Sequence, residues 1–367
     1  MDLIAPGTTL PNPLGVDGIR FIEFCGDSPG GHAAALKKIG MQRVAAKGVV
    51  AVHRQGRIVL ITNTDPASFA HGHAQAHGAG VSALGFGVAD PARAFAAAVA
   101  AGAKPLQVPQ SQKLLDVPVL EGIGGSALYL VPLHDEGSLY RQAFGVDLTR
   151  SEHEGLGFFD IDHITHNVHV GRVDHWVRFY DRVFGFKPVF RVDRDNPLGQ
   201  LTSMRTVAII SPSGRFRIAV NEPTEPESQI QQFIDENRGE GVQHIAFASH
   251  DLVSAIEAIR ATDFPFQSTP AAYYDAIEER MPRHGEDLAR LRRLGILLDG
   301  DNVGTRARPR WNSLLQIFSK NVIGPAFFEF IQRKGNDGFG ERNAQALFES
   351  IEREQIRAGQ LAGDRAH

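Results

Sequence analysis

The chain has 367 residues, which allows two ordinary domains or one large domain with a sizeable buried core. Hydrophobic residues make up 43% of it and charged residues 22%, and no apolar run is long enough to cross a bilayer. This composition excludes a disordered chain and predicts no membrane partner. The formal net charge is −4, without a basic block suited to phosphate backbones, so nucleic acid is not expected as a partner either.

Cys25 is the only cysteine, so an intrachain disulfide and zinc sites built from several thiolates are excluded. Any metal would therefore be held by histidine and carboxylate, and Cys25 itself is expected to pack as a small hydrophobic residue. The first six residues lack the basic flank and the apolar stretch of a secretion signal. A cytoplasmic location is the resulting expectation.

Two halves of the chain resemble each other in a fixed order, which is typical of two copies of one structural unit. The segment GVDGIRFIEF, around Gly18, resembles FDIDHITHNV, around His163. Each segment predicts a strand, and a helix-like stretch and a further strand follow it in both halves.

The later parts of the two halves match as well. Residues 80–99 align without gaps on residues 241–260, and each copy predicts an apolar strand that leads into an aspartate able to cap a helix. Residues 123–132 match residues 323–332 and predict one more strand in each half.

The repeat predicts two modules, residues 1–150 and 151–367. No low-complexity linker separates them, so we expect them to pack directly together. The second module carries insertions, mostly between residues 261 and 312. Within that segment the pattern predicts helices around 273–280 and 287–294, followed by a loop at 299–302.

The two copies differ at three equivalent strand positions, where the first has inert residues and the second has two histidines and a glutamate. The pairs are Gly18 and His163, Ala83 and His244, and Tyr129 and Glu329. Two histidines and one carboxylate that leave one face of a metal open are typical of non-heme Fe(II) oxygenases. The open face would let substrate and O2 bind together.

Each candidate also has an ordinary structural interpretation. A lone histidine in a strand is usually a surface residue or a hydrogen-bonded core residue, and a glutamate beside phenylalanine is often a paired structural carboxylate. Glu329 favours the metal interpretation because it lies within the apolar segment AFFEFI, where a carboxylate needs a cationic partner. His166 lies on the opposite face of its strand from His163, so we expect it to be structural.

Three further features point to less specific roles. The cluster His71, His73 and His77 lies among glycine and alanine, and we expect a solvated loop there, with adventitious metal binding as the alternative. The segment Gly338-Phe339-Gly340 resembles the start of a dinucleotide-binding loop, but no further glycine follows at the required spacing and no strand-to-helix turn is predicted there. The stretch 343–351 has helical apolar spacing and predicts a C-terminal helix, which could act as a lid over the metal.

A series of long motifs runs through the chain in order: NPLGVDGIRFIEF, IDHITHNV, VNEP, GEGVQHIAF, GILLDG, LLQIF, GPAFFEFIQRKG and GFGERN. With them the chain resembles the 4-hydroxyphenylpyruvate dioxygenases along nearly its whole length. The resemblance implies an α+β fold of tandem βαβββ vicinal-oxygen-chelate modules that form two half-barrel domains, plus a C-terminal helix. It places iron in the second module alone, and it implies a homo-oligomer.

By motif, the family's Fe(II) ligands fall on His163, His244 and Glu329. The resemblance adds Gln243 and Gln316 to the catalytic centre. It places the substrate pocket at Thr206, Asn221, Gln229, Phe318, Phe327, Phe339 and Ala344. The polar members would bind or organise the phenol end of an aromatic 2-oxo acid, and the phenylalanines would form the slot for its ring.

The pocket departs from the family pattern at several positions. Thr206 replaces a serine and adds a methyl group, and Ala219 replaces a proline. In the last motif Arg342 replaces a glycine and Ala344 a phenylalanine, which removes about a hundred Å² or more of apolar wall. The pocket therefore differs from the family more than the metal site does.

The function implied is Fe(II)-dependent conversion of 4-hydroxyphenylpyruvate and O2 to homogentisate and CO2, a step of tyrosine and phenylalanine catabolism. Ala219 and Ala344 leave open a 4-hydroxymandelate synthase or a dioxygenase of a bulkier 2-oxo acid. A metal-binding scaffold protein is the non-enzyme alternative. The carboxylate of Glu329 among phenylalanines argues against a scaffold, which has no need of it.

Overall fold

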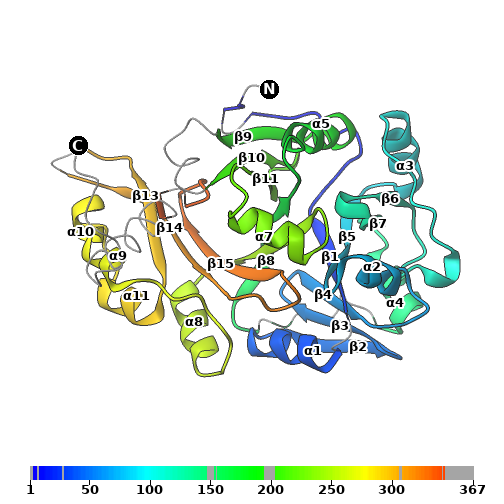
Figure 1. The fold of residues 1–367 in the computed structure, drawn as a ribbon, viewed down its shortest axis with the longest axis horizontal. Coiled ribbons are helices and arrows are strands. Elements are labelled where there is room, and N and C mark those ends of the chain that lie inside the picture. Colours follow the sequence, from blue (N-terminus) through cyan, green and yellow to red (C-terminus); the bar gives the residue numbers. More distant parts are fainter. Residues whose placement is uncertain are drawn as a thin grey trace.

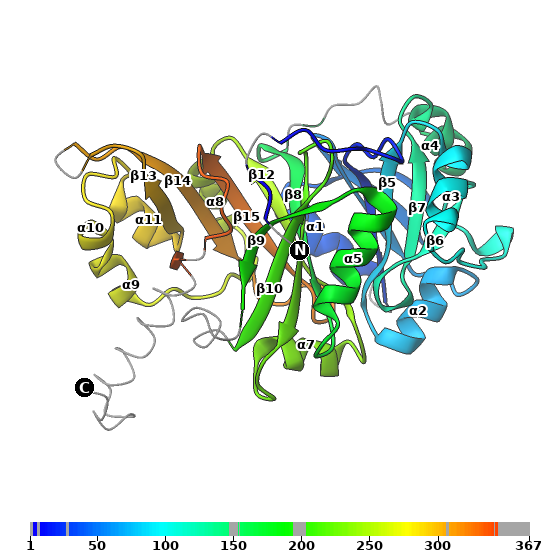
Figure 2. The same cartoon turned by 90° about the horizontal axis from the view of Figure 1, so that it is seen from above.

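The computed structural model describes residues 3–5, 8–26, 29–146, 153, 155–193, 203–305, 308–340 and 342–343. These residues form two mixed β-sheets, which lie beside each other and are flanked by helices (Figure 1). The second sheet curves into a half-barrel, which Figure 2 shows from above.

The first sheet has seven strands in the order β2-β3-β4-β1-β5-β7-β6. Its strands are β1 (Ile19–Cys25), β2 (Gln42–Lys47), β3 (Val50–Gln55), β4 (Ile58–Asn63), β5 (Gly80–Val88), β6 (Val119–Glu121) and β7 (Ala127–Pro132). The helices of this half are α1 (Pro29–Lys38), α2 (Phe69–His77), α3 (Pro91–Ala100) and α4 (Glu136–Phe144).

The second sheet has eight strands in the order β13-β14-β15-β12-β8-β11-β10-β9. Its strands are β8 (Phe158–Asn167), β9 (Lys187–Val192), β10 (Met204–Ile210), β11 (Arg217–Pro223), β12 (Gly241–Ser249), β13 (Leu297–Asn302), β14 (Trp311–Phe318) and β15 (Phe327–Lys334). Its helices are α5 (Val173–Phe184), α7 (Gln229–Glu236), α8 (Leu252–Arg260), α9 (Ala271–Asp275), α10 (Ile277–Arg280) and α11 (Leu288–Leu294).

The two sheets share one topology, as the sequence repeat predicts. In the first, β1 is antiparallel to β5 and parallel to β4, and β5 is parallel to β7. In the second, β8 is antiparallel to β12 and parallel to β11, and β12 is parallel to β15. The predicted helix caps are also confirmed, since Asp90 accepts a hydrogen bond from a backbone N–H of α3, and Asp251 accepts one from α8.

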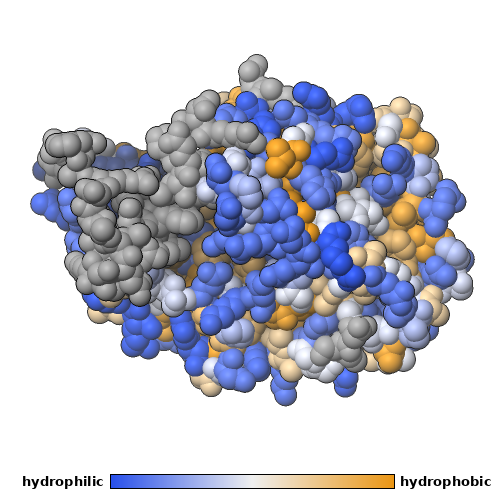
Figure 3. Space-filling view, viewed as in Figure 1, coloured by the Kyte–Doolittle hydropathy of each residue, from blue (hydrophilic) through white to orange (hydrophobic). Residues whose placement is uncertain are grey.

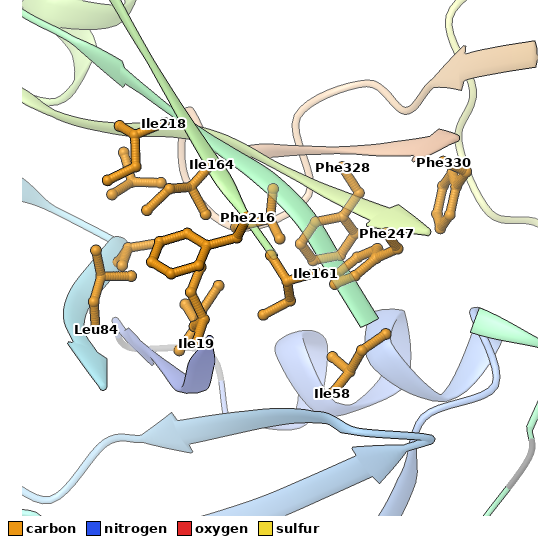
Figure 4. Packing of buried hydrophobic residues seen from close by; sticks show 14 of the residues in the cluster. Ile19, Ile58, Leu84, Ile161, Ile164, Phe216, Ile218, Phe247, Phe328 and Phe330 are labelled. Atoms are coloured by element: carbon orange, nitrogen blue, oxygen red, sulfur yellow. The ribbon is translucent and has the colours of Figure 1, made fainter. Parts of the chain in front are cut away.

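One hydrophobic core joins the two halves. Phe86 of β5 packs against Phe184, Phe186 and Phe216 of the second half, with ring centres 5.3–6.2 Å apart. Figure 4 shows the side chains of both halves meeting in one layer. Direct packing of the halves is therefore confirmed. The predicted boundary between residues 150 and 151 lies outside the described residues.

Two predicted loops are regular structure. Residues 69–77 form α2 because Ser68 caps the helix by accepting from the backbone N–H of His71, so the prediction of a solvated loop is wrong. Residues 297–302 form β13, which pairs along its whole length with β14. The pairing satisfies the backbone of an Asp- and Gly-rich stretch that looks like a loop in isolation.

The remaining structural predictions are confirmed, changed in detail or located outside the described residues. Cys25 is fully buried, and 287–294 contains α11 with Asp287 as its cap. The helix predicted at 273–280 is divided into α9 and α10 around Ala276. Nearly all of the predicted C-terminal helix, with Ala344, lies outside the described residues.

The surface is mostly hydrophilic on the face shown in Figure 3, with scattered apolar residues. Among the helices of the described ranges, none is long and apolar enough to cross a membrane.

Candidate metal centre

Three neighbouring strands bring His163, His244 and Glu329 together. The strand β12 lies between β8 and β15, and its Ala246 is paired with His163 on one side and with Glu329 on the other. His244 lies two residues before Ala246 and so projects from the same face of the sheet. The small side chain of Ala246 leaves space between the two flanking ligands.

The three side chains form a compact group in which His163 and Glu329 are buried and His244 is partly exposed. Their ligand atoms all lie within 4.8 Å of one another, and within the part of the chain that the structure describes no other group of three or more potential ligands does so. Nε2 of His163 lies 3.1 Å from Oε2 of Glu329, and Nε2 of His244 lies 3.5 Å from it. These separations would let one ion contact all three residues.

Each of the three side chains is oriented by a neighbour. Nδ1 of His163 donates to Asp162 at 2.8 Å, and Nδ1 of His244 donates to Oε1 of Gln243 at 3.1 Å. Gln316 donates to Oε1 of Glu329 at 3.1 Å. Ligand histidines typically donate their second nitrogen in this way, so the residues present fit a bound divalent metal.

The electrostatics of the group favour a cation at its centre. Burial raises the pKa of Glu329, but the charge and hydrogen bond of His163 outweigh burial and bring the pKa to about 2. Burial lowers the pKa of His163, yet the carboxylates of Glu329 and Asp162 raise it to about 9. Without a metal, the proton on His163 therefore balances the buried carboxylate.

A cavity of about 130 Å³ opens beside the three side chains. Eight of the predicted site residues line it: His163, Thr206, Asn221, His244, Gln316, Phe318, Glu329 and Phe339. Ala219, at a position where the resemblance implies a proline, is also in the lining.

The other predicted site residues lie elsewhere. Phe327 stacks on the ring of His244, with centres 4.8 Å apart. Oε1 of Gln243 accepts a hydrogen bond from Nδ1 of the same ring. Gln229 is exposed at the first position of α7 and is not in the cavity lining. Ala344 is outside the described residues. The roles assigned to these four by resemblance stay predictions.

A short polar network lies at the end of the cavity formed by β10 and β11. Thr206 and Asn221 are directly opposite each other in these strands, and the Thr206 hydroxyl donates to Oδ1 of Asn221 at 2.9 Å. Asn221 donates to Oδ1 of Asn167 at 3.4 Å, and the buried Nδ2 of Asn167 has no hydrogen-bond partner among the described residues. The network can hydrogen-bond a polar group of a bound molecule.

The sequence reasoning missed five residues of the lining: Thr165, Phe190, Val192, Met204 and Gly340. Strand alternation could have found Thr165, which shares a face with His163 and whose hydroxyl lies 2.9 Å from Nε2 of His244. Phe190, Val192 and Met204 come from β9 and β10, where no local pattern marks them, and Gly340 belongs to the GFGERN motif after β15.

Comparison with protein families supports this description in both halves of the chain. Residues 10–162 match the family model described as "Hydroxyphenylpyruvate dioxygenase, HPPD, N-terminal". Residues 160–277 match the model described as "Glyoxalase/Bleomycin resistance protein/Dioxygenase superfamily". The second half therefore has the vicinal-oxygen-chelate fold.

Individual proteins are similar over nearly the full length. A 4-hydroxyphenylpyruvate dioxygenase of Pseudomonas sp. (strain P.J. 874) is 40% identical over 362 residues, which cover 96% of this chain and 99% of that protein. The solved structure of a xylose isomerase-like TIM barrel/4-hydroxyphenylpyruvate dioxygenase fusion protein aligns with a TM-score of 0.77 at 28% identity, covering 95% of this chain and 55% of that one.

A mutant of 4-hydroxymandelate synthase from Streptomyces coelicolor aligns with a TM-score of 0.74 at 25% identity, covering 94% of this chain and 100% of that one. The fold by itself therefore does not separate a 4-hydroxyphenylpyruvate dioxygenase from a 4-hydroxymandelate synthase. The 40% identity to the Pseudomonas protein, over almost the whole of both chains, decides between them. The chain belongs to the 4-hydroxyphenylpyruvate dioxygenase family.

Proposed function

We propose that the protein is an Fe(II)-dependent dioxygenase that converts 4-hydroxyphenylpyruvate and O2 to homogentisate and CO2. The observation that carries this proposal is the compact group of His163, His244 and Glu329 beside a cavity with an aromatic wall and a polar end. Two histidines and a carboxylate leave coordination positions for substrate and O2.

His163, His244 and Glu329 would hold the Fe(II). The bound metal would supply Lewis acidity toward a 2-oxo acid and the redox chemistry that O2 requires. With a metal bound, Asp162 would keep a proton on Nδ1 of His163, which would leave the lone pair of Nε2 for the ion. Gln316 holds one oxygen of Glu329 and leaves the other directed at the histidines.

The cavity would place the aromatic ring. Phe318 and Phe339 provide apolar surface, and the hydroxyl and amide of Thr206 and Asn221 would meet the phenol. A site that hydrogen-bonds a substrate hydroxyl discriminates strongly against the analogue that lacks it. Ring placement also directs the product, because a shift on the order of 1 Å changes which carbon reacts.

The alternative product is 4-hydroxymandelate, formed when the benzylic carbon rather than the ring carbon is oxidised. Two observations favour keeping this alternative: the likeness to a 4-hydroxymandelate synthase structure, and Ala219 in the cavity lining where the family has proline. A dioxygenase of a bulkier 2-oxo acid is a further alternative, because alanine at position 219 is smaller than proline.

The test is a product analysis. Protein loaded anaerobically with Fe(II) is given 4-hydroxyphenylpyruvate and O2, and O2 uptake is followed while products are identified by mass spectrometry and NMR. We expect homogentisate, no uptake without Fe(II), and much slower uptake with phenylpyruvate. 4-Hydroxymandelate as the main product would replace the first choice, and absence of Fe(II)-dependent uptake would favour the scaffold alternative.

We also propose, from the family resemblance, that the enzyme acts in tyrosine and phenylalanine catabolism as a homo-oligomer. A cytoplasmic location is proposed separately, as the expectation of the sequence analysis. Light scattering coupled to size-exclusion chromatography tests the oligomeric state. Fractionation of cells that produce the protein tests its location.

A further inference from the structure

One arginine is hydrogen-bonded to the side chain that orients His163. Arg333 lies on β15, four residues after Glu329 and on the same face of the strand. Its Nε donates to Oδ2 of Asp162 at 2.7 Å, and its Nη2 donates to Oδ1 at 2.8 Å. The same Oδ1 accepts from Nδ1 of His163 at 2.8 Å. The guanidinium therefore fixes the carboxylate that fixes the imidazole.

The remaining nitrogen of Arg333 holds the segment that carries a wall of the cavity. Nη1 donates to the carbonyl oxygens of Asn336, at 3.0 Å, and Gly338, at 2.6 Å. The guanidinium carbon also lies 5.9 Å from the centre of the Phe339 ring. That ring packs edge-on against His163, with centres 5.3 Å apart. One side chain thus contacts both the ligand support and the substrate wall.

The geometry needs an arginine rather than any cation. A planar guanidinium can bond both oxygens of a carboxylate and still direct its remaining N–H groups elsewhere, whereas a lysine ammonium is a point charge. The side chains of Arg333 and Asp162 are only 16% and 7% exposed. Loss of the guanidinium would leave a buried carboxylate without its main charge partner, so the Asp162 side chain would no longer be held in one orientation.

The first module lacks this arrangement. Its aspartate at the position of Asp162 is Asp17, which pairs instead with Arg215 of the other half. Continuing the match of 123–132 with 323–332 by one residue sets Leu133 at the position of Arg333. The arginine is therefore present in the module that has the candidate ligands and replaced by leucine in the module that does not.

We infer that Arg333 is a positioning residue that couples the orientation of His163, through Asp162, to the placement of the Phe339 wall. This inference deepens the proposed function and rests on it, because it takes His163 as a metal ligand. A substrate ring in contact with Phe339 would therefore adjoin the side chain of Arg333, which holds Asp162 and, through it, the imidazole of His163.

The test compares Arg333→Met and Arg333→Lys with a matched control, Lys334→Met. Lys334 is the next residue on the strand and pairs on the surface with Glu286. Co(II) is titrated into each metal-free protein, its affinity and visible spectrum are recorded, and circular dichroism confirms folding at the working temperature. The KM for 4-hydroxyphenylpyruvate is then measured with Fe(II).

For Arg333→Met we expect Co(II) affinity to fall on the order of 10- to 100-fold, with an altered visible spectrum. Arg333→Lys should recover part of the Co(II) affinity, because its charge still faces Asp162. Its KM for 4-hydroxyphenylpyruvate should still be higher than that of the wild type, because one ammonium cannot also hold the carbonyls of Asn336 and Gly338. Lys334→Met should match the wild type in every measurement.

Wild-type Co(II) affinity and spectrum in folded Arg333→Met would overturn the inference while leaving the proposed function standing. Failure of the wild-type protein itself to bind Co(II) would remove the proposed function and the inference with it. If Arg333→Met does not fold, Asp162→Asn provides the decision. It removes the carboxylate but keeps its size, and wild-type Co(II) binding by this folded variant would contradict the inference equally.

Discussion

The two sheets share a topology but use their concave faces differently. In the first, Tyr129 is buried at the position of Glu329 and packs on Phe21, with ring centres 5.5 Å apart, within a cluster of apolar side chains. In the second, the corresponding face carries the candidate ligands and an open cavity. The same fold therefore supports either a packed core or a binding site, and the side chains decide which.

The largest effect should come from removing the carboxylate that distinguishes the two faces. We expect Glu329→Ala to reduce turnover by about a thousandfold or more, because a metal ligand is lost, while the fold is kept. Oxygen uptake and circular dichroism measure the two quantities. The matched variant in the other sheet, Tyr129→Phe, loses only the hydroxyl that accepts from the backbone N–H of Leu114. Tyr129→Phe should retain activity. Substantial activity in Glu329→Ala would show that Glu329 is not a metal ligand.

The contact between the halves offers a second comparison. Phe86 is fully buried among aromatic rings of the second half, so Phe86→Ala should lower the free energy of unfolding by about 3–5 kcal/mol. Denaturant unfolding measures the change. The exposed variant Val99→Ala in the same half serves as the control and should change stability by less than about 0.5 kcal/mol. A small effect of Phe86→Ala would show that the halves are held together by other contacts.

Buried His166, on the opposite face of β8 from His163, should make the second half sensitive to acid. Burial lowers its pKa from 6.5 to about 3, and its Nε2 is bonded to the hydroxyl of Tyr180. The unfolded chain takes up the His166 proton near pH 6.5, whereas the folded chain takes it up only near pH 3. The fold therefore loses stability as the pH falls from 6.5 toward 3. At pH 5 the loss is about 2 kcal/mol.

Unfolding curves of the metal-free protein at several pH values measure this loss. The slope between pH 6.5 and 4 should be smaller in His166→Gln, whereas His134→Gln, at an exposed position, should keep the wild-type slope. An unchanged slope in His166→Gln would assign the acid sensitivity to other groups.

The smallest effect is expected at the polar end of the cavity in the second sheet. Thr206→Val removes the hydroxyl that donates to Asn221, so the KM for 4-hydroxyphenylpyruvate should rise about five- to tenfold, which corresponds to about 1 kcal/mol. Thr206→Ser keeps the hydroxyl and should stay close to the wild type. Steady-state kinetics with phenylpyruvate as the comparison substrate sharpens the result. An equal rise for both substrates would separate Thr206 from recognition of the phenol.

The sequence by itself determined the repeat, most strands and the three candidate ligands. These features depend on local patterns: alternation along a strand, an aspartate such as Asp90 or Asp251 before a helix, and a polar residue where the other copy has an inert one. Because each pattern is contained in a short segment, it can be recognised without knowing which strands are neighbours.

Only the tertiary structure decided which residues support the ligands and which line the cavity. Arg333 and Asp162 are 171 residues apart in the chain, and they meet because β12 brings β15 and β8 to its two sides. The pairing of β13 with β14 likewise made a strand of a stretch that looks like a loop. Such contacts depend on strand order and register, which arise from the packing of distant segments and leave no signature within any one of them.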